Sequence, residues 1–234
     1  MKTRIIQLEP DPEPAHSAES ESLAPVVDER ETWFRRGFLF LAVVGYIVLG
    51  AIHPAEINVG DATTLYLGLH LVQPALILLL AWGIWLLVKG LPGRAAQIAR
   101  IAIVPYAIAY SMLDAIAGVA LGQVVREANG VSAADAAVVQ RLLDGNGTDY
   151  IGYGIFIASG LAWFVMALAA AMAVRTIGGL GPSVLMTIGA AIFAVGHPFP
   201  PGPIGMALFG CGIAWLELRR ARAPIPEAQP VLAP

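Results

Sequence analysis

The chain has 234 residues, of which 57% are hydrophobic and only 13% are charged, and its formal net charge is −3. A soluble domain carries about 25% charged residues. Together with a mean hydropathy of +0.71, this composition excludes a disordered chain, a nucleic-acid-binding protein and an ordinary soluble enzyme. It predicts an all-α, polytopic membrane bundle whose main partner is the lipid bilayer.

Residues 1–31 differ in composition from the rest of the chain. Eight acidic residues lie between Glu9 and Glu31, against the single base Arg30. Such a segment cannot bury enough apolar surface to offset its ordering entropy. We therefore expect a disordered, acidic cytoplasmic tail at 1–31, in which His16 is inert, a membrane bundle over 32–220, and a disordered C-terminal tail at 221–234.

Six apolar segments, each close to the roughly 20 residues that a membrane-spanning helix needs, follow the acidic tail. They cover 34–52, 65–88, 98–121, 151–174, 182–196 and 203–218. The last two are the shortest, and the proline-rich run from His197 to Pro203 must separate them, because proline blocks helix continuation. This pair is interpreted either as two full spans or as a re-entrant hairpin.

The basic residues predict the orientation of the bundle. With six spans and both termini inside, only Arg126 and Arg141 of the 14 Lys and Arg residues fall in outer segments. Cytoplasmic loops carry the excess of Lys and Arg, so this distribution indicates cytoplasmic termini. It fits a multi-pass protein of a bacterial inner membrane.

The outer loop, expected at 122–150, contains a pattern of its own. Ser132 and Asp135 resemble a capping box, and the four apolar residues that follow share one helical face: Val138, Val139, Leu142 and Leu143. The run Gly145-Asn146-Gly147 ends the pattern. We predict a short amphipathic helix that lies on the outer surface or caps the bundle.

Ionisable side chains inside membrane spans are costly and mark functional sites. His70 and Asp114 lie within predicted spans, and His53 and His197 lie at span ends. The predicted topology places all four in the outer third of the membrane. Three polar residues share faces with them and are expected to support the cluster: Gln73, Tyr110 and Ser111.

Three interpretations of this cluster remain open. Neutral imidazole is the commonest metal ligand, so His53, His70 and His197 with Asp114 would hold zinc or copper, or two of the histidines would be axial ligands to haem b. Alternatively, Asp114 would relay protons or bind a small solute, with His70, Tyr110 and Gln73. In the third interpretation the cluster joins helices in a structural subunit that binds a protein partner or a second copy. The single cysteine, Cys211, excludes a Cys-based metal site and an intramolecular disulfide.

The set of Ser111, Asp114 and three histidines resembles membrane-embedded zinc hydrolases of the ceramidase and adiponectin-receptor type, which place these residue types around one zinc ion. The resemblance covers five residues. That family has seven spans and a late His-x-x-x-His pair, whereas Pro201 stands four residues after His197 here.

The chain is also similar to small six-span bacterial membrane proteins. The likeness spans most of residues 40–210 and rests on four motifs: His53-Pro54, the run from Leu69 to Gln73, Asp114 with Gly118, and His197-Pro198 before Gly202. It implies a shared bundle and a shared polar cluster, with no particular reaction.

Overall fold

The computed structural model describes residues 29–54, 57–146, 150–196 and 201–222, and helices and short turns make up all of this part of the chain. The elements are α1 (Glu29–Ile52), α2 (Thr63–Val88), α3 (Arg94–Leu113), the π-helix η1 (Asp114–Ala120), α4 (Leu121–Ala128), α5 (Ala133–Asn146), α6 (Tyr150–Gly178), α7 (Leu180–Gly196) and α8 (Pro201–Arg222). The predicted all-helical class is confirmed.

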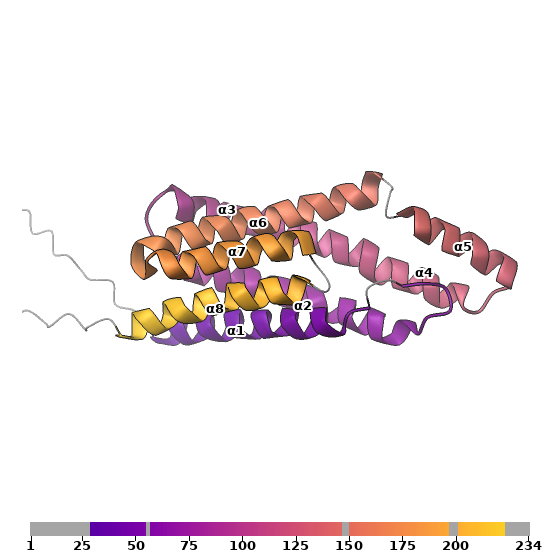
Figure 1. Ribbon diagram of the computed structural model, residues 1–234, viewed down its shortest axis with the longest axis horizontal. Helices are drawn as coiled ribbons and strands as arrows, with labels where there is room; N and C mark the ends of the chain where they lie inside the picture. The colour runs from indigo at the N-terminus through magenta and orange to yellow at the C-terminus, as the bar shows by residue number, and fades with distance from the viewer. Residues whose placement is uncertain (1–28, 55–56, 147–149, 197–200, 223–234) are drawn as a thin grey trace, which may run out of the picture.

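Six long helices form a ring around one apolar core (Figure 1). Neighbours along the ring are α1, α2, α3, α6, α7 and α8, and α8 closes it by packing against α1. The centre of the core is aromatic, with Trp163 in edge contact with both Phe193 and Phe209. The ring is the frame that brings α2 and η1 together at the site described below.

Five of these helices are long and apolar enough to cross a membrane. The sixth, α7, has 17 residues and spans about 26 Å at 1.5 Å per residue, slightly less than the ~30 Å of a hydrocarbon core. A span count of six and cytoplasmic termini thus stay predictions. Because α1 begins where α8 ends (Figure 1), we call that end of the bundle the terminal end and the opposite one the distal end.

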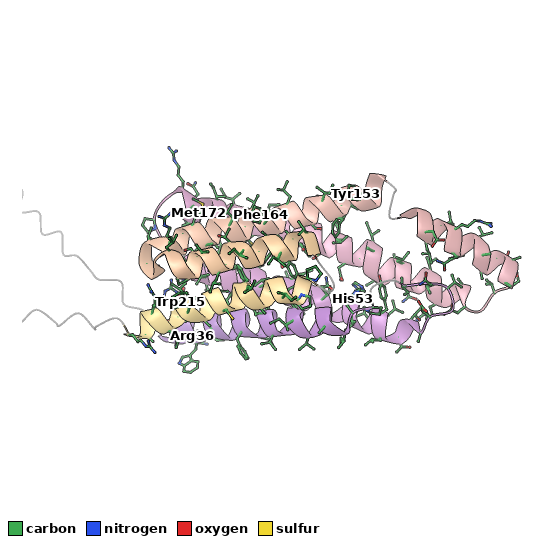
Figure 2. The ribbon with its side chains drawn as sticks, in the orientation of Figure 1. Arg36, His53, Tyr153, Phe164, Met172 and Trp215 are labelled. Atoms are coloured by element: carbon green, nitrogen blue, oxygen red, sulfur yellow. The ribbon has the colours of Figure 1, made fainter. Side chains whose placement is uncertain are left out.

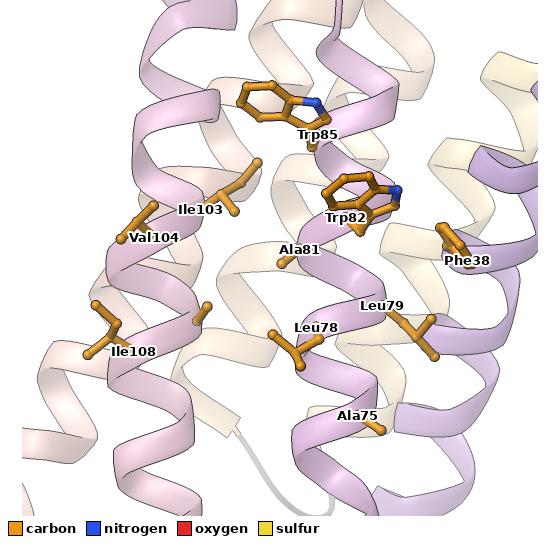
Figure 3. A pocket seen from close by; sticks show the side chains of 11 residues that line it. Phe38, Ala75, Leu78, Leu79, Ala81, Trp82, Trp85, Ile103, Val104 and Ile108 are labelled. Atoms are coloured by element: carbon orange, nitrogen blue, oxygen red, sulfur yellow. The ribbon is translucent and has the colours of Figure 1, made fainter. Parts of the chain in front are cut away.

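The outer surface of the ring is apolar, as lipid contact requires. Leu78 on α2 and Val104 on α3 are 61% and 59% exposed. These two helices and α1 enclose an open groove of about 840 Å³. Figure 3 shows Trp82 and Trp85 at one end of this groove and Ala75 with Ile108 at the other. The architecture therefore fits an integral membrane protein.

The third long helix is longer than predicted. It runs without a break from Arg94 to Ala128 through η1 and α4, whereas the prediction ended it at Leu121 and began the loop at Gly122. The polar residues of α4 predict a loop, but Gly122, Val125 and Ala128 form a buried stripe on the helix. Helix α1 likewise begins at Glu29, inside the predicted tail.

The predicted helix in the outer loop is confirmed as α5, and its N-terminal cap is present. The Asp135 backbone N–H donates to Ser132 Oγ at 3.3 Å, and Ser132 Oγ donates to the Asp135 carboxylate at 2.7 Å. The apolar residues expected on one face of α5 differ in burial. Leu142 is 70% exposed, whereas Leu143 is half-buried. In Figure 1, α5 extends beyond the ring at the distal end.

Candidate functional site

A buried hydrogen bond joins α2 to η1 near the distal end. His70 Nδ1 lies 2.6 Å from Asp114 Oδ1, and both residues are buried. His70 is in α2, and Asp114 is the first residue of the π-helix. Polar side chains are stable in an apolar interior when they are hydrogen-bonded. The pairing confirms that Asp114 points into the bundle.

His53, directly after α1, extends this pair toward the distal end. Its Nε2 lies 3.0 Å from His70 Nε2, and its Nδ1 lies 2.6 Å from the carbonyl oxygen of Pro54. The two imidazole rings are nearly perpendicular, with centroids 5.0 Å apart. His53 is half-buried and is labelled in Figure 2 at the end of α1. The result is a linear chain of contacts from Pro54 through His53 and His70 to Asp114.

Counting hydrogens along this chain shows what it needs. The Pro54 carbonyl can only accept, so His53 Nδ1 carries a hydrogen. An ionised Asp114 also only accepts, so His70 Nδ1 carries a hydrogen as well. In a neutral imidazole the second nitrogen is then a lone pair. Two lone pairs thus face each other across 3.0 Å, an arrangement that one cation between them, a proton or a metal ion, would stabilise.

The surroundings of His53 favour its neutral form. Burial is the main influence and lowers the pKa of His53 from the ordinary value of 6.5, although the hydrogen bond to Pro54 acts in the opposite direction. A neutral imidazole with Nδ1 protonated leaves Nε2 free to act as a ligand. The hydrogen bond to Pro54 therefore fixes the tautomer in which Nε2 of His53 is the unprotonated nitrogen.

Glycine and tyrosine hold the His70 ring from two sides. A Cβ atom on Gly118 would overlap the His70 ring. On the other side, the Tyr66 ring lies 4.5 Å from the His70 ring by centroids, and the Tyr66 hydroxyl donates to the Ala117 carbonyl. Sequence reasoning noticed Gly118 only as a packing residue and missed Tyr66. Tyr66 lies four residues before His70 on the same helical face. This spacing is the feature of the sequence that could have identified Tyr66 as a neighbour of His70.

The three predicted supporting residues lie at different distances from this chain. Tyr110 is buried, and its ring contacts Tyr106 at 5.2 Å. The Tyr106 hydroxyl in turn lies 3.3 Å from that of Tyr46. Gln73 is buried and Ser111 half-buried, but no hydrogen bond within the described residues links either of them to the histidines or to Asp114. Their supporting role stays a prediction.

His197 lies outside the described residues, so its predicted place in the cluster is not tested. Within the described ranges, no group of three or more His, Cys, Asp or Glu side chains converges as a metal site would. The described geometry therefore supplies two imidazole nitrogens and one carboxylate behind them. A complete ligand set for zinc or copper needs at least one further donor.

Two amides tie the loop after His53 to the distal helices, and sequence reasoning missed both. Asn129 accepts from the Gly60 N–H at 2.6 Å and donates to the Asp61 carbonyl at 3.0 Å. Gln140 on α5 accepts from the Val59 N–H at 2.8 Å. The α1–α2 loop is thus fixed beside the site by contacts more than 60 residues away in sequence.

Helix lengths place His70 and Asp114 at similar distances from the terminal end. Asp114 lies 20 residues after Arg94, and His70 lies 18 residues before Val88. At 1.5 Å per residue these separations are about 30 Å and 27 Å.

Comparison of the chain with protein-family models, with curated proteins and with solved structures gives no match.

Proposed function

We propose that this integral membrane protein binds one transition-metal ion, zinc or copper, between His53 and His70. The observation that carries the proposal is the pair of imidazole Nε2 atoms that face each other at 3.0 Å. Two imidazole nitrogens on one tetrahedral ion with bonds of 2.0–2.1 Å are about 3.3 Å apart, so a small opening of the pair admits the ion. His197 is the proposed third ligand.

Asp114 and Pro54 act behind the ligands in this proposal. Metal-binding histidines donate their second N–H to a carboxylate or a backbone carbonyl, which orients the ring and raises its basicity. His70 has the carboxylate partner, and His53 has the carbonyl partner. These two hydrogen bonds orient both rings for an ion between the Nε2 atoms.

The contact between the rings favours a bare ion over haem at this position. A porphyrin between two axial histidines would separate their nitrogens by more than a hydrogen bond, and these nitrogens lie 3.0 Å apart. The perpendicular rings are also in edge contact, which leaves no layer for a macrocycle. Haem b is therefore the less favoured of the cofactors that the sequence suggested.

A binding site is also favoured over a proton or solute path through the bundle. The tyrosines near Asp114 continue the polar region only as far as Tyr46 and Tyr106. Beyond them, the described parts of the six ring helices contain no carboxylate, imidazole or amine until Glu217 and the arginines at the terminal end. A relay would need donors in that gap, so the polar chain ends inside the bundle.

The distribution of basic residues leads us to place the site on the outer side of a bacterial inner membrane. The terminal end carries most Lys and Arg residues, including three arginines in the last turn of α8. Under the positive-inside rule this end faces the cytoplasm, and the distal end with His53 faces outward. An ion would then reach the site from the outer aqueous phase.

Elemental analysis and an absorption spectrum of detergent-purified protein, produced with zinc, copper and iron supplied, test the proposal. We expect about one zinc or copper ion per chain and no Soret band, and we expect His53→Asn and His70→Asn to lose the ion. His16→Asn, which changes a histidine of the N-terminal segment, is the matched control and should keep it. A metal-free wild type, or full metal content in both variants, would overturn the assignment.

The structural alternative predicts a different pattern in the same samples. If the chain of contacts only joins helices, His70→Asn lowers the melting temperature while metal content is zero throughout. The transport alternative predicts a pH-dependent flux in vesicles that Asp114→Asn abolishes. Neither pattern includes a stoichiometric ion that His53→Asn removes from a folded protein.

A further inference from the structure

A second polar cluster lies at the terminal end, where α1 and α8 meet. Glu217 on α8 accepts from three arginines: Arg35 at 3.0 Å, Arg36 at 2.8 Å and Arg220 at 2.9 Å. The Glu217 side chain is only 11% exposed, and the Arg35 side chain only 13%. One carboxylate is therefore the shared centre of three guanidinium groups from two helices.

The charges within this cluster do not balance. Among the described residues, three guanidinium groups against one carboxylate leave an excess of two positive charges at a partly buried position. In addition, Arg35 Nε is buried and has no hydrogen-bond partner among the described residues. The nearby Lys89 is paired with Glu31 at 2.7 Å and does not change the excess. Partly buried cations of this kind require a counter-ion.

The cluster lies at the depth of lipid headgroups. It occupies the ends of two helices that are long and apolar enough to cross a membrane, and Trp33 and Trp215 beside it are 73% and 41% exposed. Tryptophan is enriched where the hydrocarbon core meets the headgroups. Figure 2 shows Trp215 and Arg36 close to the terminal end of the bundle.

We propose that Arg35, Arg36 and Arg220 bind the phosphate of an anionic phospholipid at this end of the bundle. Guanidinium groups bind phosphate oxygens through paired, charge-assisted hydrogen bonds, and basic pockets between membrane helices bind acidic headgroups. Glu217 holds the three arginines together in this arrangement and leaves their excess charge for the phosphate. The site is independent of the metal proposal and lies at the opposite end of the molecule.

Lipid retention by purified full-length protein tests the proposal. The protein is incubated in detergent with phosphatidylglycerol or with phosphatidylcholine, and bound lipid is counted by native mass spectrometry alongside the melting temperature. We expect phosphatidylglycerol to be retained and to raise the melting temperature, while phosphatidylcholine and inorganic phosphate have little effect. Stabilisation by inorganic phosphate alone, or equal retention of both lipids, would overturn the lipid assignment.

Variants of the cluster separate a lipid-binding role from a structural one. Arg36→Gln and Arg220→Gln should each lower phosphatidylglycerol affinity about fivefold, because each removes one positive charge that faces the phosphate. Arg126→Gln, at an exposed arginine of α4 that pairs with Glu127, is the matched control. If the cluster is purely structural, the two variants of its arginines lower the melting temperature and leave lipid affinity unchanged.

Discussion

At the scale of single residues, the site depends on which ring nitrogens carry hydrogen. The Pro54 carbonyl and the Asp114 carboxylate each take up the Nδ1 hydrogen of one histidine. The Nε2 atoms then face each other with nothing to donate. Loss of the acceptor that holds an Nδ1 hydrogen allows that imidazole ring to change tautomer. Substitution of single residues around the two rings therefore tests the arrangement.

Asp114→Asn should weaken metal binding by roughly 10- to 100-fold, as the loss of an orienting carboxylate does at other sites. Asparagine can still accept from His70 Nδ1 but lacks the charge that raises the basicity of Nε2. A competition titration with a chromophoric zinc chelator measures the effect. Asp144→Asn, at a residue that is exposed on α5, is the control, and equal affinity of the two variants would contradict the role given to Asp114.

Gly118→Ala should destabilise the protein, because a Cβ there overlaps the His70 ring. Forcing an extra methyl into a packed interior costs typically 1–3 kcal/mol. Gly68→Ala on α2 is the matched control, since its Cβ would meet no atom within 4 Å, and alanine in a helix is more favourable than glycine by up to about 1 kcal/mol. Thermal unfolding should therefore shift in opposite directions for the two variants. A shift in the same direction would show that the His70 ring moves aside freely.

At the scale of elements, the π-helix and the clamped loop set the positions of the site residues. Asp114 opens η1, and Gly118 within η1 contacts His70. Short π-helical segments inside α-helices occur frequently at functional sites. The α1–α2 loop brings His53 to the same place from the other direction and is held there by Asn129 and Gln140. The site is thus assembled from two helices and a tethered loop.

Asn129→Ala should release this loop. It removes two hydrogen bonds, from the Gly60 N–H and to the Asp61 carbonyl, each worth roughly 0.5–1.5 kcal/mol. Hydrogen–deuterium exchange of residues 57–61 should accelerate while exchange in α2 stays unchanged. Metal affinity should fall as His53 loses its fixed position. Unchanged exchange in 57–61 would show that Gln140 alone holds the loop.

Part of the site could be predicted from sequence, and the limits have physical causes. The pairing of His70 with Asp114 follows from helix faces and the cost of a charge in an apolar bundle. The contact between His53 and His70 joins the end of α1 to α2, and residues 59–61 of the following loop are held by Asn129 and Gln140 from distant parts of the chain. The π-helix has no periodicity of its own in the sequence, and α4, which carries a buried stripe, is only eight residues long. These features depend on tertiary contacts.

At the scale of the whole molecule, hydropathy predicted the helices better than it predicted their ends. All six expected spans correspond to helices of the ring, because long apolar segments can satisfy their backbone only as helices in lipid. The observed helix ends differ from the predicted ones where polar residues continue a helix beyond its apolar segment, as in α4 and at the start of α1. The orientation of the ring in the membrane rests on basic residues alone.

Accessibility of single cysteines checks that orientation. In a Cys211→Ala background, we expect a membrane-impermeant maleimide added to intact cells to label Ser132→Cys between α4 and α5. Pro92→Cys, in the turn between α2 and α3, should react only after the cells are opened. Both positions are exposed, so reactivity reports the side of the membrane. The reverse pattern would place the termini and the arginine cluster outside.

The continuous helix from Arg94 to Ala128 has an electrical consequence. In the proposed orientation, about 30 Å of this helix precedes Asp114, which puts the site near the outer edge of the layer across which a membrane potential falls. Moving one charge through the full potential is worth ~2.3 kcal/mol per 100 mV, but an ion entering from the distal side crosses only a small part of it. Its affinity for the His53–His70 pair should therefore be nearly the same in energised and in depolarised membranes.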